Sequence, residues 1–139
     1  MSVYIGGTYD ILHSGHLRLF RWAEANFGPV TIGLNSDLFV ERYKGKLPVM
    51  RYAERVDILL ELRCVYSVIP NYGCEDSKPA ILIAKPTYIV CGSDWTRERQ
   101  MKQMGLTEEF LTENGITLVI FPGSLPIHSS DIKKRILEQ

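Results

Sequence analysis

The chain has 139 residues, of which 45% are hydrophobic and 23% charged, a composition typical of one globular domain with a sizeable core. Its 16 basic residues balance 16 acidic ones, so no net field draws the protein to nucleic acid or to an acidic membrane. No apolar run approaches the roughly 18 residues that span a bilayer, and no secretory leader opens the chain. We therefore expect a cytoplasmic protein that binds small molecules rather than nucleic acid or membranes.

The predicted elements begin with a strand, and strands and helices then alternate. Strand-like apolar runs occur at Val3 to Ile5, Val30 to Leu34, Val65 to Ile69, Tyr88 to Cys91 and Leu118 to Phe121. Helical patterns occur at Gly15 to Asn26, Ala53 to Leu62, Ser77 to Ala84, Thr107 to Asn114 and Ser130 to Leu137. Short apolar strands without strong period-two alternation predict a five-stranded parallel sheet with helices on both faces. Because no repeat or linker interrupts this order, residues 1–139 are predicted to form a single α/β domain.

Polar residues follow most of the predicted strands, at the edge where parallel strands end. They comprise Thr8 to His16, Asn35 to Asp37, Gly92 to Trp95 and Pro122 to Ser130. Right-handed crossovers place the ligand crevice of such a sheet at its carboxyl edge. These loops are therefore predicted to converge on one site.

The turn after the first strand has the features of a phosphate-binding turn. Two glycines end the strand and permit a tight turn, and the following helix directs unpaired N–H groups at an anion. His13 and His16 lie three residues apart, close enough to share a face, and Gly15 leaves room for a ligand. Alternatively, Ser14 caps an ordinary helix and both histidines face solvent.

The stretch Gly7-Thr8-Tyr9-Asp10-Ile11-Leu12-His13-Ser14-Gly15-His16 resembles the signature of the cytidylyltransferase-like nucleotidyltransferases. Members of that superfamily join a nucleoside triphosphate to a phosphate-bearing acceptor and release pyrophosphate. The resemblance implies a Rossmann-like domain, Mg²⁺ and a homodimer. It is closest to the glycerol-3-phosphate cytidylyltransferases, which favours CTP over ATP. It also implies that His13 and His16 are catalytic, and that the nucleotide is bound by Gly7, Thr8, Tyr9 and Gly15.

Basic residues after the second strand are expected to neutralise phosphate charge. Transfer to an α-phosphorus spreads negative charge over non-bridging oxygens and the leaving group, so catalysis needs positioned cations. Lys44 and Lys46, on a predicted loop over residues 42–46, match the family's lysine-bearing loop. Arg55 resembles the arginine of a family Glu-x-Arg element, and we assign it a catalytic role. The alternatives are a solvated loop and a surface ion pair of Arg55 with a neighbouring carboxylate.

Two later stretches resemble nucleotide-binding elements of the family. Gly92-Ser93-Asp94-Trp95 resembles a Gly-Asp-Asp-Trp stretch and implies that Asp94 and Trp95 bind the nucleotide, although Trp95 alternatively packs under the next loop. Ile127 to Lys133 resembles a hydroxyl-rich helix N-terminus of the family, and this resemblance implies that Ser129 and Ser130 bind the β- and γ-phosphates. Alternatively, one of these serines is a plain helix cap. The chain departs from the family pattern at Ser93, at His128 and at Gly123, where the closest relatives carry an arginine.

We assign Asp10 to the phosphorylated acceptor. Arg97 and Arg99 receive the same assignment, because they follow Asp94 and Trp95 in a stretch, residues 96–112, that is longer than in the smallest relatives. The expected reaction is direct in-line displacement, in which an acceptor phosphate oxygen attacks the α-phosphorus without a covalent enzyme intermediate. Two alternatives stay open. One is an adenylyltransferase that acts on a sugar phosphate or a flavin, and the other is a degenerate protein that binds a nucleotide without transferring it, a reading suggested by Gly123.

Overall fold

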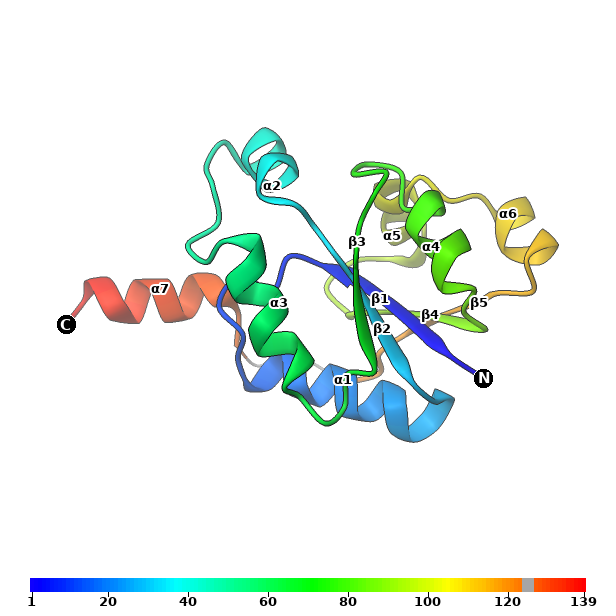
Figure 1. Cartoon of the computed structure of the whole chain (residues 1–139), viewed down its shortest axis with the longest axis horizontal. Helices are drawn as coiled ribbons and strands as arrows, with labels where there is room; N and C mark the ends of the chain where they lie inside the picture. Colours follow the sequence, from blue (N-terminus) through cyan, green and yellow to red (C-terminus); the bar gives the residue numbers. More distant parts are fainter. Residues whose placement is uncertain (124–126) are drawn as a thin grey trace.

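The structure contains one sheet, which is parallel throughout and has the strand order β3-β2-β1-β4-β5 (Figure 1). The computed structural model describes residues 1–123 and 127–139. The strands are β1 (Val3–Gly7), β2 (Val30–Leu34), β3 (Ser67–Pro70), β4 (Tyr88–Cys91) and β5 (Thr117–Ile120). Strand β1 lies at the centre and pairs with β2 over its whole length, from Val3↔Val30 to Gly7↔Leu34. The predicted α/β class and five-stranded parallel sheet are confirmed.

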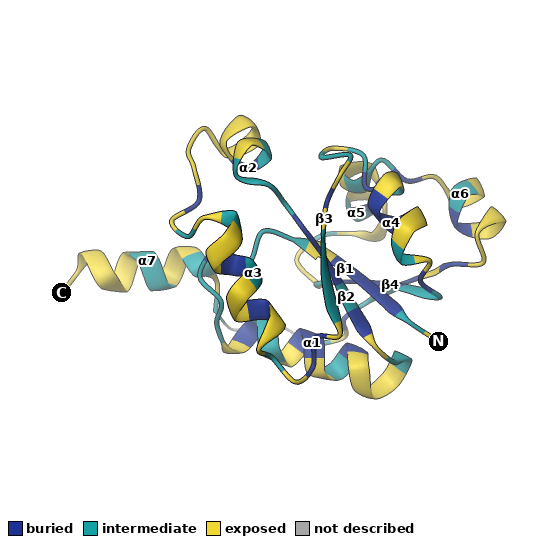
Figure 2. Ribbon diagram, in the orientation of Figure 1, coloured by how far each residue is buried: buried dark blue, intermediate teal, exposed yellow. Residues whose placement is uncertain are grey.

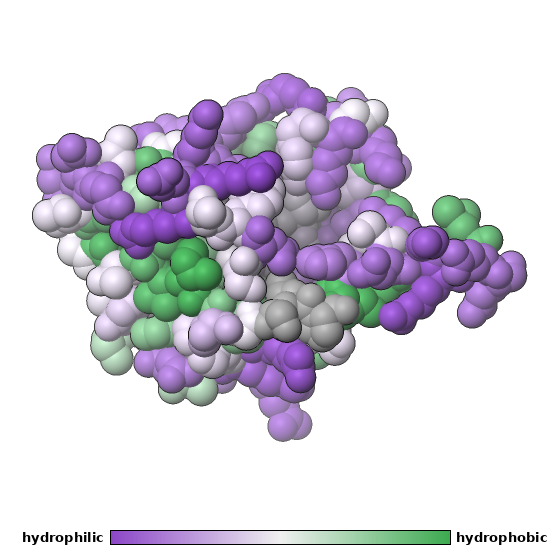
Figure 3. Space-filling model, turned by 180° about the vertical axis from the view of Figure 1, so that it is seen from behind, coloured by the Kyte–Doolittle hydropathy of each residue, from purple (hydrophilic) through white to green (hydrophobic). Residues whose placement is uncertain are grey.

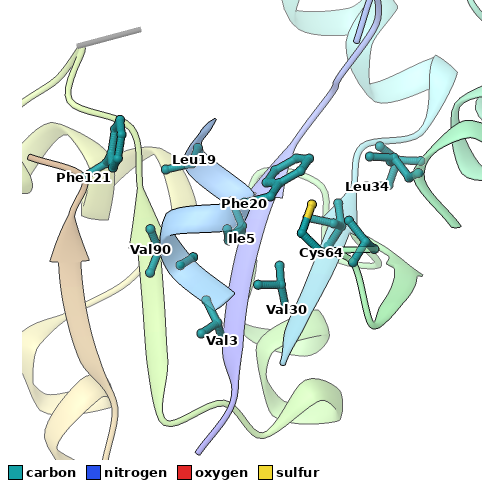
Figure 4. Close-up of a cluster of buried hydrophobic side chains, with 13 residues drawn as sticks. Val3, Ile5, Leu19, Phe20, Val30, Leu34, Cys64, Val90 and Phe121 are labelled. Carbon is teal, nitrogen blue, oxygen red and sulfur yellow. The ribbon is translucent and has the colours of Figure 1, made fainter. Parts of the chain in front are cut away.

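Helices cover both faces of this sheet. They are α1 (Ser14–Phe27), α2 (Asp37–Lys44), α3 (Tyr52–Leu60), α4 (Lys78–Ala84), α5 (Arg97–Met104), α6 (Glu108–Glu113) and α7 (Ser129–Leu137). On one face, Phe20 of α1 and Leu59 of α3 join a core that includes Val3, Ile5 and Val30 of the strands (Figure 4). Burial on both faces explains why the strands read as apolar runs rather than as alternating patterns.

The second face is covered by α4, α5 and α6. Ile81, Met101 and Leu111 of these helices pack with Tyr4 and Ile89 of the sheet. Figure 2 shows the complementary pattern, in which the outward faces of the helices are exposed, the central strands β1 and β2 are mostly buried and the edge strand β3 is mostly intermediate. Helices thus pack on both faces of the sheet and support the strands up to their carboxyl ends.

Most element bounds agree with the sequence prediction to within two residues, but two local expectations are wrong. Helices α2 and α5 are not predicted by the sequence pattern. The predicted loop over residues 42–46 is partly helical, because α2 continues through Lys44 and ends where Gly45 adopts φ 78°. The two glycines after the first apolar run belong to β1, so the chain turns only after Gly7.

Helix α7 projects from the body of the molecule, and none of its residues is buried (Figure 1). Seen from behind, the surface is mostly hydrophilic, with hydrophobic residues gathered on part of the body and along the projecting helix (Figure 3). Ile136 and Leu137 are exposed there. Within residues 1–123 and 127–139, no helix is both long enough and apolar enough to cross a membrane.

Candidate active site

A cleft of about 570 Å³ opens at the carboxyl edge of the sheet. The residues that follow β1, β2, β3 and β4 and the first turn of α7 all contribute to its wall. The predicted site residues that line it are Gly7, Thr8, Tyr9, Asp10, His13, His16, Lys44, Lys46, Asp94, Ser129 and Ser130. The predicted site residues that do not line it are Gly15, Arg55, Trp95, Arg97 and Arg99.

The turn after β1 is built around Tyr9, whose φ of 49° lies in the left-handed region. Its hydroxyl donates to the Gly6 carbonyl over 3.2 Å, and its ring folds back over Gly7. A Cβ atom at Gly7 would lie 2.7 Å from the tyrosine ring, so glycine is needed at that position. The edge of the same ring meets His16, with ring centroids 5.0 Å apart. Tyr9 therefore positions a predicted catalytic imidazole.

The two histidines stack on each other at the start of α1, with ring centroids 3.8 Å apart. His13 is the N-cap, since its Nδ1 accepts from the Gly15 amide over 3.1 Å. The Nδ1 of His16 accepts from the amide of His13 over 3.2 Å. Because both Nδ1 atoms are acceptors, each neutral ring carries its proton on Nε2 as a donor. The alternative in which Ser14 caps the helix and the histidines are solvated is wrong.

Both imidazoles are held in the neutral state. Burial lowers the pKa of His16 to about 3, and the neighbouring His13 and His128 add to that shift. Burial also lowers the pKa of His13, followed by the effect of His128. A neutral imidazole still donates one hydrogen bond, so the pair can donate to phosphate oxygens without acting as acids.

Helix α7 begins against α1, which brings a second helix N-terminus to the cleft. A Cβ atom at Gly15 would lie 3.2 Å from the Ile127 carbonyl, so the missing side chain lets the two segments approach closely. Ser129 Oγ donates to the Ile11 carbonyl over 3.2 Å. The N-cap position of α7 is His128 rather than either predicted serine. The backbone N–H groups at both helix starts suit an anion.

Asp10 lies beneath this junction and is only 6% exposed. Its two carboxylate oxygens accept from the amides of Val49 and Met50 over 2.9 and 2.8 Å, and Lys133 Nζ lies 3.0 Å from Oδ2. Burial alone would raise the pKa of this carboxyl, but the two amides and Lys133 outweigh that effect and lower it. The predicted acceptor ligand thus holds α7 and the segment before α3 together.

Lys44 and Lys46 are exposed and line the cleft from α2 and from the segment that follows it. Lys44 Nζ lies 5.6 Å from the ring centroid of Tyr43, and Tyr43 Oη is 3.0 Å from Thr8 Oγ1. The hydroxyl contact ties α2 to the turn after β1. Both ammonium groups are therefore placed where charge on a bound phosphate could be neutralised.

Arg55 is 1% exposed and lies behind the cleft rather than in it. Its guanidinium donates to the carbonyls of Thr8, Asn35 and Met50, and it forms an ion pair with Asp37 at 2.7 Å. These partners take four of its five N–H donors, and the side chain does not line the cleft, so the predicted contact with phosphate is not made in this geometry. The alternative of a surface ion pair is wrong as well, because the Arg55 side chain is buried and its partner is Asp37 rather than a neighbouring carboxylate of the same helix.

The residues after β4 divide into two groups. Asp94 lines the cleft, with its Oδ2 3.9 Å from His128 Nδ1. Trp95 turns away and lies under Arg99, whose guanidinium carbon is 4.7 Å from the ring centroid. Arg97 pairs with Glu108 at 3.1 Å and donates to the Leu118 carbonyl. The predicted roles of Trp95, Arg97 and Arg99 in binding substrate therefore lack a place in the cleft.

Two departures from the family pattern contact each other. Ser93 Oγ donates to the Gly123 carbonyl over 2.8 Å, which joins the loop after β4 to the loop after β5. The rest of the predicted stretch between Pro122 and the last helix includes residues 124–126, which lie outside the described residues.

The cytidylyltransferase-like family model matches residues 4–135. The chain belongs to this family. It is similar to the bifunctional protein HldE of Hyphomonas neptunium (38% identity over 96 residues) and of Geobacter metallireducens (39% over 100 residues). These matches cover 68% and 69% of the chain but 20% of each relative, so the chain spans about a fifth of the length of these curated relatives.

Solved structures show the same fold as this cytidylyltransferase-like chain. The lipopolysaccharide core biosynthesis protein from Thermoplasma volcanium GSS1 gives a TM-score of 0.69 at 21% identity, over 87% of this chain and 95% of that one. A protein with unknown function from Archaeoglobus fulgidus gives 0.60 at 24% identity, over 87% and 89%. At these identities the likeness concerns the fold alone.

Sequence reasoning missed several residues that line the cleft of this cytidylyltransferase-like protein. They include Tyr43, Asn71, Ser77 and Lys133, whereas Asn35 belongs to the loop after β2 that the sequence predicts at the site. Asn71 directly follows β3, so the rule that sites form at the carboxyl edge was sufficient to find it. Lys133 lies one turn into α7, and its contact with Asp10 depends on tertiary structure.

The described residues of the cleft do not by themselves provide a cluster of metal ligands. Among the residues that the structure describes, no group of three or more His, Cys, Asp or Glu side chains is placed to hold a metal. Mg²⁺ commonly binds through one or two carboxylates together with substrate phosphates. Asp94 is the cleft-lining carboxylate without an amide or lysine partner in the described chain, so it fits such shared binding.

Proposed function

We propose that the chain transfers a nucleoside monophosphate from a nucleoside triphosphate to a phosphorylated small molecule, with release of pyrophosphate. The observation that supports this best is the stacked pair of neutral histidines, whose Nδ1 atoms are fixed by backbone amides. An acceptor phosphate is already ionised at neutral pH, so the reaction requires no general base. Donors and cations around the α-phosphorus are what it does require.

In the proposed reaction, an acceptor phosphate oxygen forms a bond to the α-phosphorus as the bond to the bridging oxygen of pyrophosphate breaks. The Nε2 protons of His13 and His16 donate to phosphate oxygens, and Lys44 and Lys46 neutralise the growing charge. The N-terminus of α7 binds the β- and γ-phosphates through the Ser130 hydroxyl and the free amides of Ser129 and Ser130, while the Ser129 hydroxyl holds the Ile11 carbonyl. Mg²⁺, when bound with the nucleotide and Asp94, supplies further positive charge. Arg55 holds the β1 and β2 loops in position.

CTP is our first candidate for the nucleotide, with a glycerol 3-phosphate-like acceptor, as the resemblance of the sequence motifs implies. The second candidate is adenylyl transfer to a sugar phosphate, which is favoured by the similarity to the HldE proteins. A homodimer stays an expectation, to be checked by sedimentation equilibrium.

The test is to incubate the protein with each nucleoside triphosphate, Mg²⁺ and a panel of phosphorylated acceptors, and to follow pyrophosphate release. Thermal unfolding ranks the nucleotides first, because a ligand at 100 times its dissociation constant adds about 2.7 kcal/mol of stability. We expect one nucleotide to stand out and to give pyrophosphate only with a suitable acceptor. Binding without pyrophosphate release from any pair would favour the degenerate alternative.

A further inference from the structure

Asn71 lines the cleft and carries a buried hydrogen-bond acceptor. The residue follows β3, is 7% exposed and lines the cleft wall. Its Nδ2 donates to Asn35 Oδ1 and to the Cys74 carbonyl, each over 2.9 Å. These two acceptors fix the amide orientation, because the reversed side chain would place its own oxygen against both of them. Oδ1 is left without a hydrogen-bond partner among the described residues.

A chain of hydrogen bonds holds Asn71 in place. Asn35 Nδ2 donates to Thr8 Oγ1 over 3.1 Å, and Thr8 Oγ1 lies 3.0 Å from Tyr43 Oη. The series joins the segments that follow β3, β2 and β1 to helix α2. An unpaired buried carbonyl costs free energy, and a rigid network prevents the side chain from turning to reach a donor elsewhere. A ligand that donates to Oδ1 would remove that cost.

The surroundings of Asn71 indicate the chemistry of that ligand. The other cleft-lining residues from the segment after β3, the start of α4 and the end of α5 include Cys74, Ser77, Gln103 and Met104, which carry no formal charge. Outside the cleft wall, Arg42 and Glu75 neutralise each other in an ion pair at 2.7 Å. A neutral group with hydroxyl donors suits this wall better than a cationic group.

We propose that Asn71 Oδ1 accepts a hydrogen bond from a hydroxyl of the acceptor, which makes Asn71 a specificity-determining residue for hydroxylated phosphate esters such as polyol and sugar phosphates. The proposal rests on the function proposed above, in which the nucleotide occupies the Asp94 side of the cleft. The acceptor phosphate then lies near the histidines and lysines, with its hydroxylated part against the segment after β3.

The first experiment uses pairs of probes of matched size on the wild-type protein. Glycerol 3-phosphate is compared with n-propyl phosphate, and glucose 1-phosphate with cyclohexyl phosphate, at saturating nucleotide. We expect kcat/KM for the hydroxylated member of the productive pair to be about 10- to 100-fold higher. Equal turnover within both pairs, or a preference for phosphocholine, would overturn the proposal whether or not any variant folds.

The second experiment uses Asn71→Leu, which removes the acceptor atom at similar volume, and Asn114→Leu as a matched control on the exposed end of α6. We expect the preference for hydroxylated probes to fall to within about threefold in Asn71→Leu and to persist in Asn114→Leu, with the KM for nucleotide unchanged. A preference that survives in Asn71→Leu, as when water alone serves Oδ1, overturns the proposal. A raised KM for the nucleotide in Asn71→Leu, in place of a lost preference for hydroxylated probes, also overturns the proposal.

Failure of the proposed function would look different. If no nucleotide and acceptor pair releases pyrophosphate, the nucleotidyl transfer itself is wrong. Titration calorimetry of the same probe pairs against both variants then still tests Asn71, because a preference in binding that is lost only in Asn71→Leu supports its contact with a hydroxyl. Equal binding within each pair by the wild-type protein contradicts it.

Discussion

His16 combines a buried position with a single free donor, and this combination decides what it can contribute. Its Nδ1 is occupied by the amide of His13, and its low pKa keeps the ring neutral. A neutral, preorganised N–H is most useful when charge develops on a phosphate oxygen in the transition state, because no reorganisation is then needed.

We expect His16→Ala to lower kcat by about 10²-fold or more, the scale of removing one transition-state donor, with a much smaller change in KM for the nucleotide. Ser14→Ala is the control, since Ser14 is exposed, lies in the same turn of α1 and does not line the cleft. It should stay within twofold of wild type, on the order expected for a solvated surface residue. Full activity in His16→Ala measured by pyrophosphate release would remove His16 from catalysis.

The depressed pKa of His16 also predicts how stability depends on pH. The unfolded chain takes up a proton near pH 6.5, whereas the folded protein does so only near pH 3. The unfolded state therefore binds more protons between these values, and the free energy of unfolding falls as pH drops through this window. From pH 7 to pH 5 the loss from His16 reaches about 2 kcal/mol.

Urea unfolding at pH 7, 6 and 5 measures this effect in the wild type and in His16→Asn, which does not titrate. The variant should lose less stability over the same range. Asp10 does not confuse the comparison, because its pKa is already lowered from 3.8 and its contribution is lost only at more acidic pH. Parallel losses in both proteins would mean that His16 is protonated in the folded state.

At the scale of elements, the buried guanidinium of Arg55 joins three segments behind the cleft. It extends from α3 to carbonyls of the β1 and β2 loops and to Asp37 at the start of α2. Removing the guanidinium leaves a carboxylate that is 26% exposed, together with three partly buried carbonyls, without this donor. We expect Arg55→Met to lower the free energy of unfolding by about 3 kcal/mol, as found when one partner of a buried pair is removed.

The control is Arg63→Met, because Arg63 is exposed and lies in the turn after α3. It should change stability by no more than about 0.5 kcal/mol in the same denaturant titration. If Arg55→Met were as stable as Arg63→Met but unable to bind nucleotide, Arg55 would instead contact phosphate, as the sequence resemblance implies.

The same elements explain what the sequence predicts well. The strands, α1 and α3 can be predicted from the sequence, because apolar runs mark the strands and repeated buried positions mark the two helices. Helices α2 and α5, which the sequence does not predict, bury one residue each, Val40 and Met101. Little burial alone does not hide a helix, because α6 buries one residue and α7 none, and both are predicted. The histidine motif is local and therefore readable, whereas the Arg55 network and the chain of hydrogen bonds to Asn71 join residues 18 to 47 positions apart. Such pairings follow from strand order, which the sequence pattern alone does not fix.

At the scale of the whole molecule, α7 differs from every other described helix in burying no residue. Two contacts attach its first turns to the body, Ser129 to the Ile11 carbonyl and Lys133 to Asp10. Few buried apolar contacts imply that α7 opens locally at low free energy. Its amides should therefore exchange with solvent faster than those of α1.

Nucleotide binding should slow amide exchange in the first turns of α7, because Ser129, Ser130 and Lys133 line the cleft. If opening of α7 requires release of the phosphates, nucleotide at 100 times its dissociation constant slows exchange by about 100-fold. Hydrogen exchange with Mg²⁺ and the nucleotide that gives the larger thermal shift measures this. Helix α6 lies away from the cleft and should be unaffected. Slowing in α1 without slowing in α7 would mean that the histidine turn alone binds the triphosphate.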